Sequence, residues 1–179
     1  MVSSRADRVP ATAPASVRFR AAVGDDARRL AELERDANLV ALAHVFPPTQ
    51  FAFPFDDVCA RWAQVLADPA CHVDVVDRPG PAGLLDGFVA YDRARLRHLA
   101  VRPDRFGDGL AAQVLARAET GMRALGARSG YLWVLVANRR ARRFYERHGW
   151  QPTRHRQACE WAPYPVETQY RRDLAGDQR

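Results

Sequence analysis

The chain has 179 residues, of which 47% are hydrophobic and 27% are charged, so one domain with a core of ordinary size can form. The formal charge is +6, and no apolar run approaches the roughly eighteen residues that span a bilayer, which argues against a membrane-spanning helix. Three widely spaced cysteines without a Cys-x-x-Cys pair argue against a disulfide framework and a zinc site, and they favour the reducing cytoplasm.

Residues 1–16 are rich in Ala, Pro and Ser and contain no continuous apolar stretch, so they make a poor secretory signal. We expect them to form a flexible lead-in to one domain over residues 17–174. Residues 175–179 are expected to form a flexible tail.

The elements of the domain follow from hydrophobic periodicity and from residues that begin or end helices. Apolar residues alternate or run together in strand-like segments at 17–21, 71–76, 84–91, 95–101, 131–136, 150–156 and 166–172. Apolar faces at helical spacing predict helices that begin near Asp25 or Asp26, near Asp56 or Asp57, at about Gly109 and at Asn138. Strand–helix–strand units in the middle of the chain require some parallel pairing in the sheet.

A glycine-containing turn joins the strand that ends at Val101 to the helix near Gly109. Gly107 and Gly109 let the backbone approach an anion, and the free N–H groups at the helix start favour a phosphate there. The same glycines also suit an ordinary connection between a strand and a helix. The segment lacks the ending of a P-loop and the three glycines of a dinucleotide fingerprint.

A second segment, residues 131–150, runs from a buried strand into a short helix. Asn138 can cap this helix, and Ala141 and Tyr145 share one of its faces. The hydroxyl of Tyr145 can donate a proton to a leaving thiolate. The alternative for a tyrosine beside Phe144 is ordinary packing in the core.

Together the two segments resemble the GNAT acetyltransferase superfamily. The first is similar to that family's pyrophosphate loop, Q/R-x-x-G-x-G/A after a strand ending in L-x-V, through Leu99, Ala100, Val101, Gly107, Gly109, Leu110 and Ala111. The second is similar to N-x-x-A-x-x-F-Y-x-x-x-G-F/W through Asn138, Ala141, Phe144, Tyr145, Gly149 and Trp150. Phe106 stands where the family usually has Gln or Arg, and the acid Asp108 lies between the glycines. The resemblance implies a mixed α/β fold, with a centrally splayed sheet of six to seven strands flanked by about four helices.

The resemblance also implies an N-acetyltransferase that moves an acetyl group from acetyl-CoA to a primary amine by direct attack, without a metal. The residues it implies for cofactor binding are Leu99, Ala100 and Val101 along the pantetheine arm, Phe106, Gly107, Asp108, Gly109, Leu110 and Ala111 at the pyrophosphate, and Asn138, Ala141 and Phe144 on the other side. It implies that Tyr145 protonates the departing thiolate.

The base that accepts the proton of the amine is left open among His98, His44, Asp92 and Glu167. The acceptor, a small-molecule or peptide amine, is expected near the aromatic segments 44–55 and 158–167. Their phenylalanines can instead cover the edge of the core. No acidic cluster occurs in these segments, which disfavours a polycationic acceptor.

Two other classes of protein are alternatives. The departure at Phe106 and the lack of an obvious base are compatible with a non-catalytic sensor that binds acyl-CoA. The arginines at 139, 140, 142 and 143 suggest nucleic-acid binding. However, a chain with 27 arginines, no lysine and no isoleucine is typical of a GC-rich genome. We therefore expect neither a nucleic-acid partner nor a membrane partner, and exposed late strands allow a homodimer.

Overall fold

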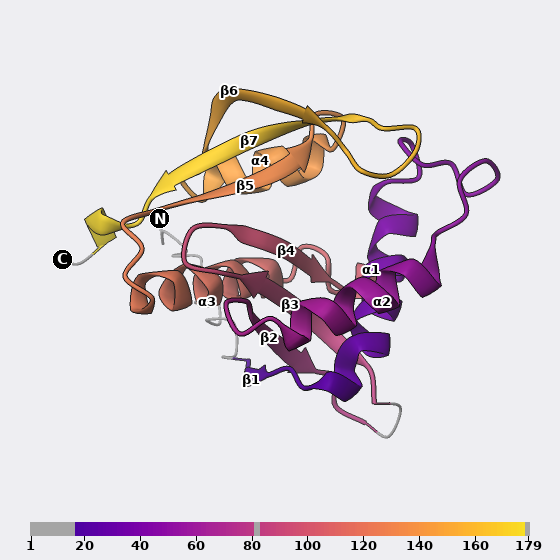
Figure 1. The fold of residues 1–179 in the computed structure, drawn as a ribbon, viewed down its shortest axis with the longest axis horizontal. Helices are drawn as coiled ribbons and strands as arrows, with labels where there is room; N and C mark the ends of the chain where they lie inside the picture. Colours follow the sequence, from indigo (N-terminus) through magenta and orange to yellow (C-terminus); the bar gives the residue numbers. More distant parts are fainter. Residues whose placement is uncertain (1–16, 81–82, 178–179) are drawn as a thin grey trace, which may run out of the picture.

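Seven strands form two antiparallel sheets in the computed structural model, which describes residues 17–80 and 83–177 (Figure 1). The first sheet has the order β1–β2–β3–β4, with bounds Arg20–Ala21, His72–Asp77, Leu85–Tyr91 and Leu96–Val101. The second has the order β5–β7–β6, with bounds Ser129–Leu135, Val166–Asp173 and Gln151–Ala158. The predicted lead-in, 1–16, and the end of the predicted tail, 178–179, lie outside the described residues.

The described residues also form four α-helices and three short 3-10 turns. The helices are α1, Ala27–Ala41, α2, Phe55–Ala67, α3, Leu110–Ala124, and α4, Arg139–Arg147; the 3-10 turns are Gly24–Asp26, Pro103–Arg105 and Ala175–Asp177. The predicted mixed α/β fold with six to seven strands and about four helices is confirmed. None of the helices described here is both long enough and apolar enough to cross a membrane.

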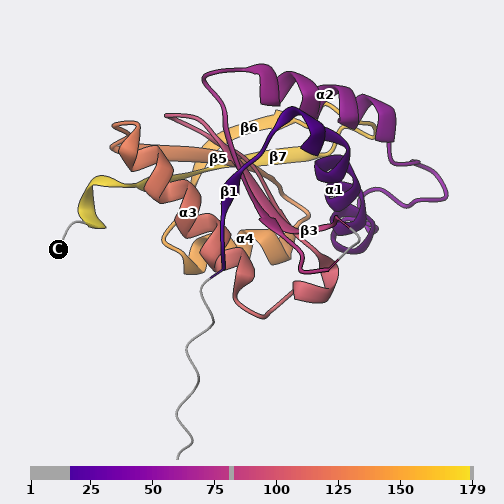
Figure 2. The ribbon, with the colours of Figure 1, turned by 90° about the horizontal axis from the view of Figure 1, so that it is seen from below.

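The central strand β3 is buried along its whole length because helices cover both of its faces. Alternate side chains of a strand point to opposite faces. Val89 and Tyr91 accordingly join the cluster that α3 covers, whereas Phe88 and Ala90 join the cluster that α1 and α2 cover. Figure 2 shows α3 and the α1–α2 pair on opposite sides of the strands. The α3 cluster also contains Leu132 of β5, so it connects the two sheets.

Most predicted bounds differ from the structure by one or two residues, and two differences change how a segment is used. The strand predicted at 17–21 is reduced to Arg20–Ala21, since the backbone N–H of Val17 donates to Gln113 Oε1 of α3 (3.2 Å) and not to β2. Helix α2 begins at Phe55, with Pro54 at the N-cap, so the aspartates expected as caps stand in its first turn. There they still face the positive end of the helix dipole.

The predicted parallel pairing is confined to one bridge. Arg95, at the start of β4, pairs with Tyr131 of β5, and the backbone N–H of Tyr131 donates to Ala94 O (3.0 Å). All ladders between the named strands are antiparallel. Among the described residues, the neighbouring edge strands β4 and β5 of the two sheets therefore share one backbone bridge.

Candidate functional site

The edge of β4 that faces β5 is unpaired beyond the Arg95 bridge, within the part of the chain that the structure describes. The backbone N–H of Arg102 donates to Asp86 O (2.9 Å), which continues the register of β4 on β3. In an antiparallel ladder, residues alternate between bonding the neighbour and facing away from it. Leu99 and Val101 therefore direct their N–H and C=O groups to the open edge. A second extended chain can pair with this edge.

The open edge leads to the start of α3. Gly109 is the N-cap of this helix, and both Gly107 (φ 89°) and Gly109 (φ 92°) have left-handed backbones. A Cβ at either position would meet no heavy atom within 4 Å, so the loop is open above its backbone. The free N–H groups and the dipole at the start of a 15-residue helix favour an anion here.

Asp108 occupies part of this anion site. Its Oδ1 accepts the backbone N–H of Leu110 (2.9 Å), and its other oxygen pairs with Arg105. Burial acts to raise the pKa of Asp108, but the N–H of Leu110 and the guanidinium of Arg105 outweigh it and hold the pKa below its ordinary value. Arg105 also pairs with the buried Asp86, which fixes the loop against β3.

A cavity of about 370 Å³, here called the cofactor cavity, lies between the open edge of β4, the loop and α4. Its walls include most of the residues that the sequence predicted for the cofactor, namely Leu99, Ala100, Val101, Phe106, Gly107, Gly109, Ala111, Asn138, Ala141 and Phe144. Two predicted residues do not line it. Asp108 bonds the loop itself, and the side chain of Leu110 is buried in the core.

Two of the four residues predicted on the α4 side, Asn138 and Tyr145, carry polar side chains that are used differently. Asn138 caps α4, with its Oδ1 accepting the N–H of Ala141 (3.1 Å), as the sequence predicted. Tyr145 is buried and lines the cofactor cavity, and burial raises the pKa of its hydroxyl well above the ordinary value. The hydroxyl is therefore protonated at neutral pH. The catalytic role of Tyr145 stays a prediction.

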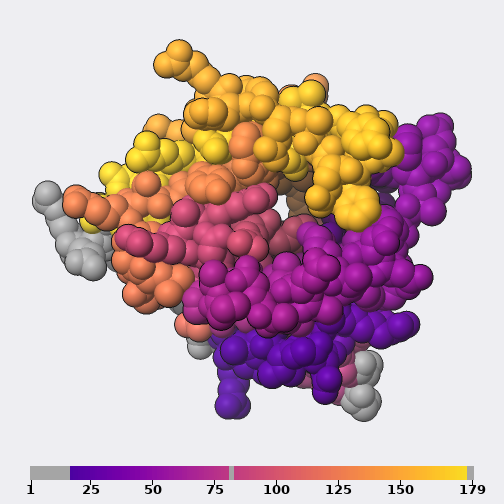
Figure 3. All heavy atoms as spheres, in the orientation of Figure 1, coloured from indigo at the N-terminus to yellow at the C-terminus, as the bar shows by residue number. Residues whose placement is uncertain are grey.

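A second cavity of about 500 Å³, here called the acceptor cavity, joins the cofactor cavity. The residues that line both are Asn38, Leu42, His98, Leu99, Asn138, Ala141 and Tyr145. Figure 3 shows the surface hollowed between the late strands and the α1–α2 region. Tyr145 and His98 thus stand where the two cavities meet.

A third cavity of about 220 Å³, here called the apolar cavity, opens beside the acceptor cavity. Glu34, Asn38, Leu42, Phe46 and Trp161 line both. Further apolar walls come from Leu39, Phe51, Phe53, Pro54 and Val58. Each alternative for the aromatic segment 44–55 therefore holds for part of it. Phe46, Phe51 and Phe53 line a cavity, whereas Phe55 packs against the edge of the core under α1 and α2.

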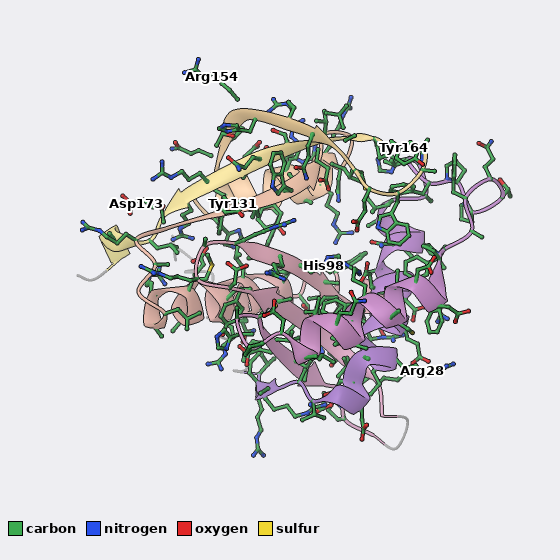
Figure 4. All side chains as sticks on the ribbon, in the orientation of Figure 1. Arg28, His98, Tyr131, Arg154, Tyr164 and Asp173 are labelled. Carbon is green, nitrogen blue, oxygen red and sulfur yellow. The ribbon has the colours of Figure 1, made fainter. Side chains whose placement is uncertain are left out.

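His98 lies between the two layers of the molecule, in the region beside α1 and α2 (Figure 4). Its ring stacks on Phe88 (5.5 Å between centroids, 13° between planes) and meets the edge of Trp62. Its Nε2 lies 3.5 Å from Glu34 Oε2, the oxygen that also accepts Trp62 Nε1 (2.8 Å) and Arg61 Nη2 (2.6 Å). These contacts hold the imidazole in one orientation at the cavity wall.

Burial is the main cause that lowers the pKa of His98 below its ordinary value of 6.5. The carboxylate of Glu34 opposes this effect, and the charges of Arg61 and Arg95 reinforce it. The imidazole is accordingly neutral at pH 7 and able to accept a proton. Sequence reasoning missed Glu34. Its signal was a carboxylate among the apolar residues of the buried face of α1.

The other predicted bases occupy different places. Asp92 accepts Arg97 Nε (2.8 Å) and two backbone N–H groups of the β3–β4 turn, and it lines neither the cofactor cavity nor the acceptor cavity. His44 is exposed, with its Nε2 3.1 Å from Ala137 O. Glu167 lines the acceptor cavity, where it accepts Gln157 Nε2 (2.8 Å). Only His98 among the four candidates lines both the cofactor cavity and the acceptor cavity.

Comparisons with known proteins agree with this architecture. Residues 14–150 match the sequence profile of the acetyltransferase (GNAT) family. A GCN5-related N-acetyltransferase from Rhodopseudomonas palustris superposes with a TM-score of 0.72 at 15% identity, over 91% of this chain and 99% of that one. No curated protein sequence matches the chain.

Two further solved structures have the same fold. The PaiA N-acetyltransferase of Thermoplasma acidophilum, in complex with coenzyme A, has a TM-score of 0.64 at 14% identity, over 88% of this chain and 99% of that one. A variant of the spermidine N-acetyltransferase SpeG of Vibrio cholerae has a TM-score of 0.63 at 20% identity, over 89% and 96%.

Proposed function

Because the chain belongs to the acetyltransferase (GNAT) family and is thus an acyltransferase, we propose that it transfers an acetyl group from acetyl-CoA to an amine by direct attack. The observation that carries the proposal is the open edge of β4, which leads into the anion site at the start of α3. The coenzyme A complex of the PaiA structure supports this choice of cofactor.

Acetyl-CoA has two parts that suit the two features of the cofactor cavity. Its pantetheine arm carries amide groups, which fit the N–H and C=O groups of Leu99 and Val101 at the open edge. Its pyrophosphate fits the backbone N–H groups around Gly107 and Gly109. Ala141 and Phe144 of α4 form the opposite wall and exclude water from the arm.

Two side chains at the junction of the cavities suit the proton transfers. Acetyl-CoA supplies a thioester, whose C–S bond breaks as the amine nitrogen forms a bond to the acetyl carbon. The neutral imidazole of His98 accepts the proton that the amine loses. The hydroxyl of Tyr145 donates a proton to the departing sulfur, so no net charge is left in the buried junction.

The acceptor cavity is the proposed place of the amine. The spermidine N-acetyltransferase of similar fold supports a small-molecule amine in general. All three cysteines are free, in keeping with the reducing cytoplasm that the sequence favours. Strand β6 is exposed along the edge of the second sheet, and it is the proposed surface for a homodimer.

Calorimetric titration of the purified protein with acetyl-CoA, at two salt concentrations, tests the proposal. We expect saturable one-to-one binding that weakens at the higher salt, because part of the affinity comes from the pyrophosphate. The acetylation rate is then measured for Tyr145→Phe, which should lose about a hundredfold or more in kcat while acetyl-CoA binding is kept. Tyr131→Phe, on β5 and away from the cavities, is the matched control and should retain activity.

Two results would contradict the proposal in different ways. No detectable acetyl-CoA binding would mean that the fold serves another purpose. Binding of acetyl-CoA without turnover of any amine would select the non-catalytic sensor.

A further inference from the structure

We infer that the acceptor carries a carboxylate and a large apolar group next to its amine, as a large apolar α-amino acid does. The inference rests on the proposed function and names the class of acceptor. Three features carry it, namely an uncompensated arginine in the acceptor cavity, a second arginine that lines the same cavity and the adjoining apolar cavity.

Arg95 is the first feature. It lines the acceptor cavity at the point where β4 and β5 meet. Its Nε is buried without a hydrogen-bond partner, and its guanidinium forms no ion pair with a carboxylate among the described residues. A buried guanidinium nitrogen without an acceptor costs free energy, which a bound carboxylate would recover.

The phosphates of acetyl-CoA do not explain Arg95. The proposed pyrophosphate site begins beyond Val101, at the other end of β4. Arg95 and Val101 are six positions apart in nearly extended chain, which is a distance of about 20 Å at roughly 3.3 Å per residue. The anion that Arg95 suits therefore belongs to the other substrate.

Arg61 of α2 is the second feature. It lines the same cavity, and its Nη2 is held by Glu34 while its Nε is buried without a partner. Arg61 and Arg95 both lie close enough to His98 to act on its protonation. The two guanidinium groups and the proposed base therefore line one cavity, which can take the carboxylate and the amine of a single α-amino acid.

The other charged side chains of the cavity are Arg97, which forms ion pairs, and two glutamates, Glu160 and Glu167. Arg97 is paired with Asp92 (2.8 Å) and Asp68 (3.7 Å). Glu167 accepts the Gln157 amide, and Glu160 lies with it on the side of the late strands. A polycation would meet the uncompensated Arg95, which disfavours spermidine as the acceptor.

The apolar cavity is the third feature. It adjoins the acceptor cavity through Phe46 and Trp161, and its remaining walls are mostly aromatic and aliphatic. Aromatic and aliphatic walls of this kind bind apolar side chains. With the carboxylate at the arginines and the amine at His98, the side chain of the acceptor points into this space.

Initial rates of acetylation on four matched amines test the inference. L-Phenylalanine has all three groups, L-phenylalaninamide lacks only the charge of the carboxylate, phenethylamine lacks the carboxylate entirely, and spermidine lacks the carboxylate and the apolar group. L-Tryptophan, L-leucine and L-methionine extend the series to other apolar side chains. We expect kcat/KM for L-phenylalanine to exceed that of each of the three non-carboxylates at least tenfold.

The variant Arg95→Met removes the charge and keeps an unbranched side chain of similar reach. We expect a rise of tenfold or more in KM for L-phenylalanine and a much smaller change for phenethylamine, because the carboxylate contact is lost for L-phenylalanine alone, whereas the effect of the charge on His98 is shared by both amines. Arg93→Met, an exposed position in the turn before β4, is the matched control and should change neither value. Acetyl-CoA affinity, measured by calorimetry, should be the same in all three proteins.

The outcomes separate this inference from the proposed function. Equal or better acetylation of phenethylamine or spermidine would overturn the inference and leave the acetyltransferase intact. An equal loss for both acceptors in Arg95→Met would also overturn it, because the effect would then be structural. Failure of a protein that binds acetyl-CoA to acetylate any of the four amino acids would overturn it as well.

Discussion

The guanidinium of Arg140 lies over the ring of Phe106, 3.7 Å from its centroid. Phe106 stands in the loop before α3, at the position where the GNAT family usually has Gln or Arg. Arg140 comes from α4 and lines the cofactor cavity. A positive charge is thus brought from α4 to the position of Phe106, and the aromatic ring holds it in place.

This contact predicts that Arg140→Ala weakens acetyl-CoA binding. The expected loss is about 1 kcal/mol, or roughly fivefold in Kd, and it should shrink as salt is added. Arg139→Ala is the matched control, since Arg139 is its neighbour on α4 and does not line the cavity. Calorimetric titration of the three proteins measures the difference. Equal affinities for Arg140→Ala and wild type would show that Arg140 does not serve the cofactor.

Asp108 is expected to limit acetyl-CoA affinity. Asp108→Asn keeps an oxygen for the N–H of Leu110 but removes a negative charge close to the proposed pyrophosphate. Removing repulsion near the protein surface gains about 1 kcal/mol or more, so the affinity should rise roughly fivefold. Asp104→Asn changes an exposed acid nearby and is the control. Weaker binding by Asp108→Asn would mean that the carboxylate serves to order the loop.

The activity is expected to fall on the acid side below pH 6.5, because the folded-state pKa of His98 is lower than this ordinary value. The neutral imidazole accepts a proton and the charged form does not, so kcat/KM is lost as the pH falls through that pKa. His98→Asn should remove this limb of the pH profile and lower kcat about a hundredfold.

The carboxylate of Glu34, next to His98, provides a second test of the role of His98 as the base. Glu34 raises the pKa of His98, so Glu34→Gln should shift the acid limb to lower pH. A pH profile of kcat/KM measures the shift. If the acid limb lies at the same pH in Glu34→Gln and in the wild type, a group other than His98 causes it.

The packing of α3 on β3 predicts one stability effect. An added Cβ at Gly121 would lie 2.2 Å from the hydroxyl oxygen of Tyr91, which donates to the buried Asp74 (3.1 Å). Gly121→Ala should therefore lower the free energy of unfolding by about 1–3 kcal/mol, although alanine favours helices. Thr120→Ala, an exposed neighbour on α3, should be neutral or slightly stabilising. Urea unfolding curves compare the variants, and a stable Gly121→Ala would show that Tyr91 moves at little cost.

The sequence by itself determined the elements that depend on neighbouring residues. The turn glycines 107 and 109, the Asn138 cap and the stop at Gly149 act through backbone contacts within a few residues, and the structure has them where the pattern placed them. The spacing of these features also carried the resemblance to the family, which the profile match confirms.

Only the tertiary structure decided which polar side chains meet at the junction of the cavities. Glu34 and Arg61 lie 27 residues apart in the chain, and His98 comes from a third element. On the sequence, Glu34 is an acid on a helix and Arg95 is one of 27 basic residues. The packing of α1, α2 and β4 decides that Glu34 is buried and bonded to Arg61, and that the Nε of Arg95 is buried without a partner. Hydrophobic burial drives that packing, and it is non-directional. The residues near each side chain in the sequence therefore do not indicate which distant side chains it will meet.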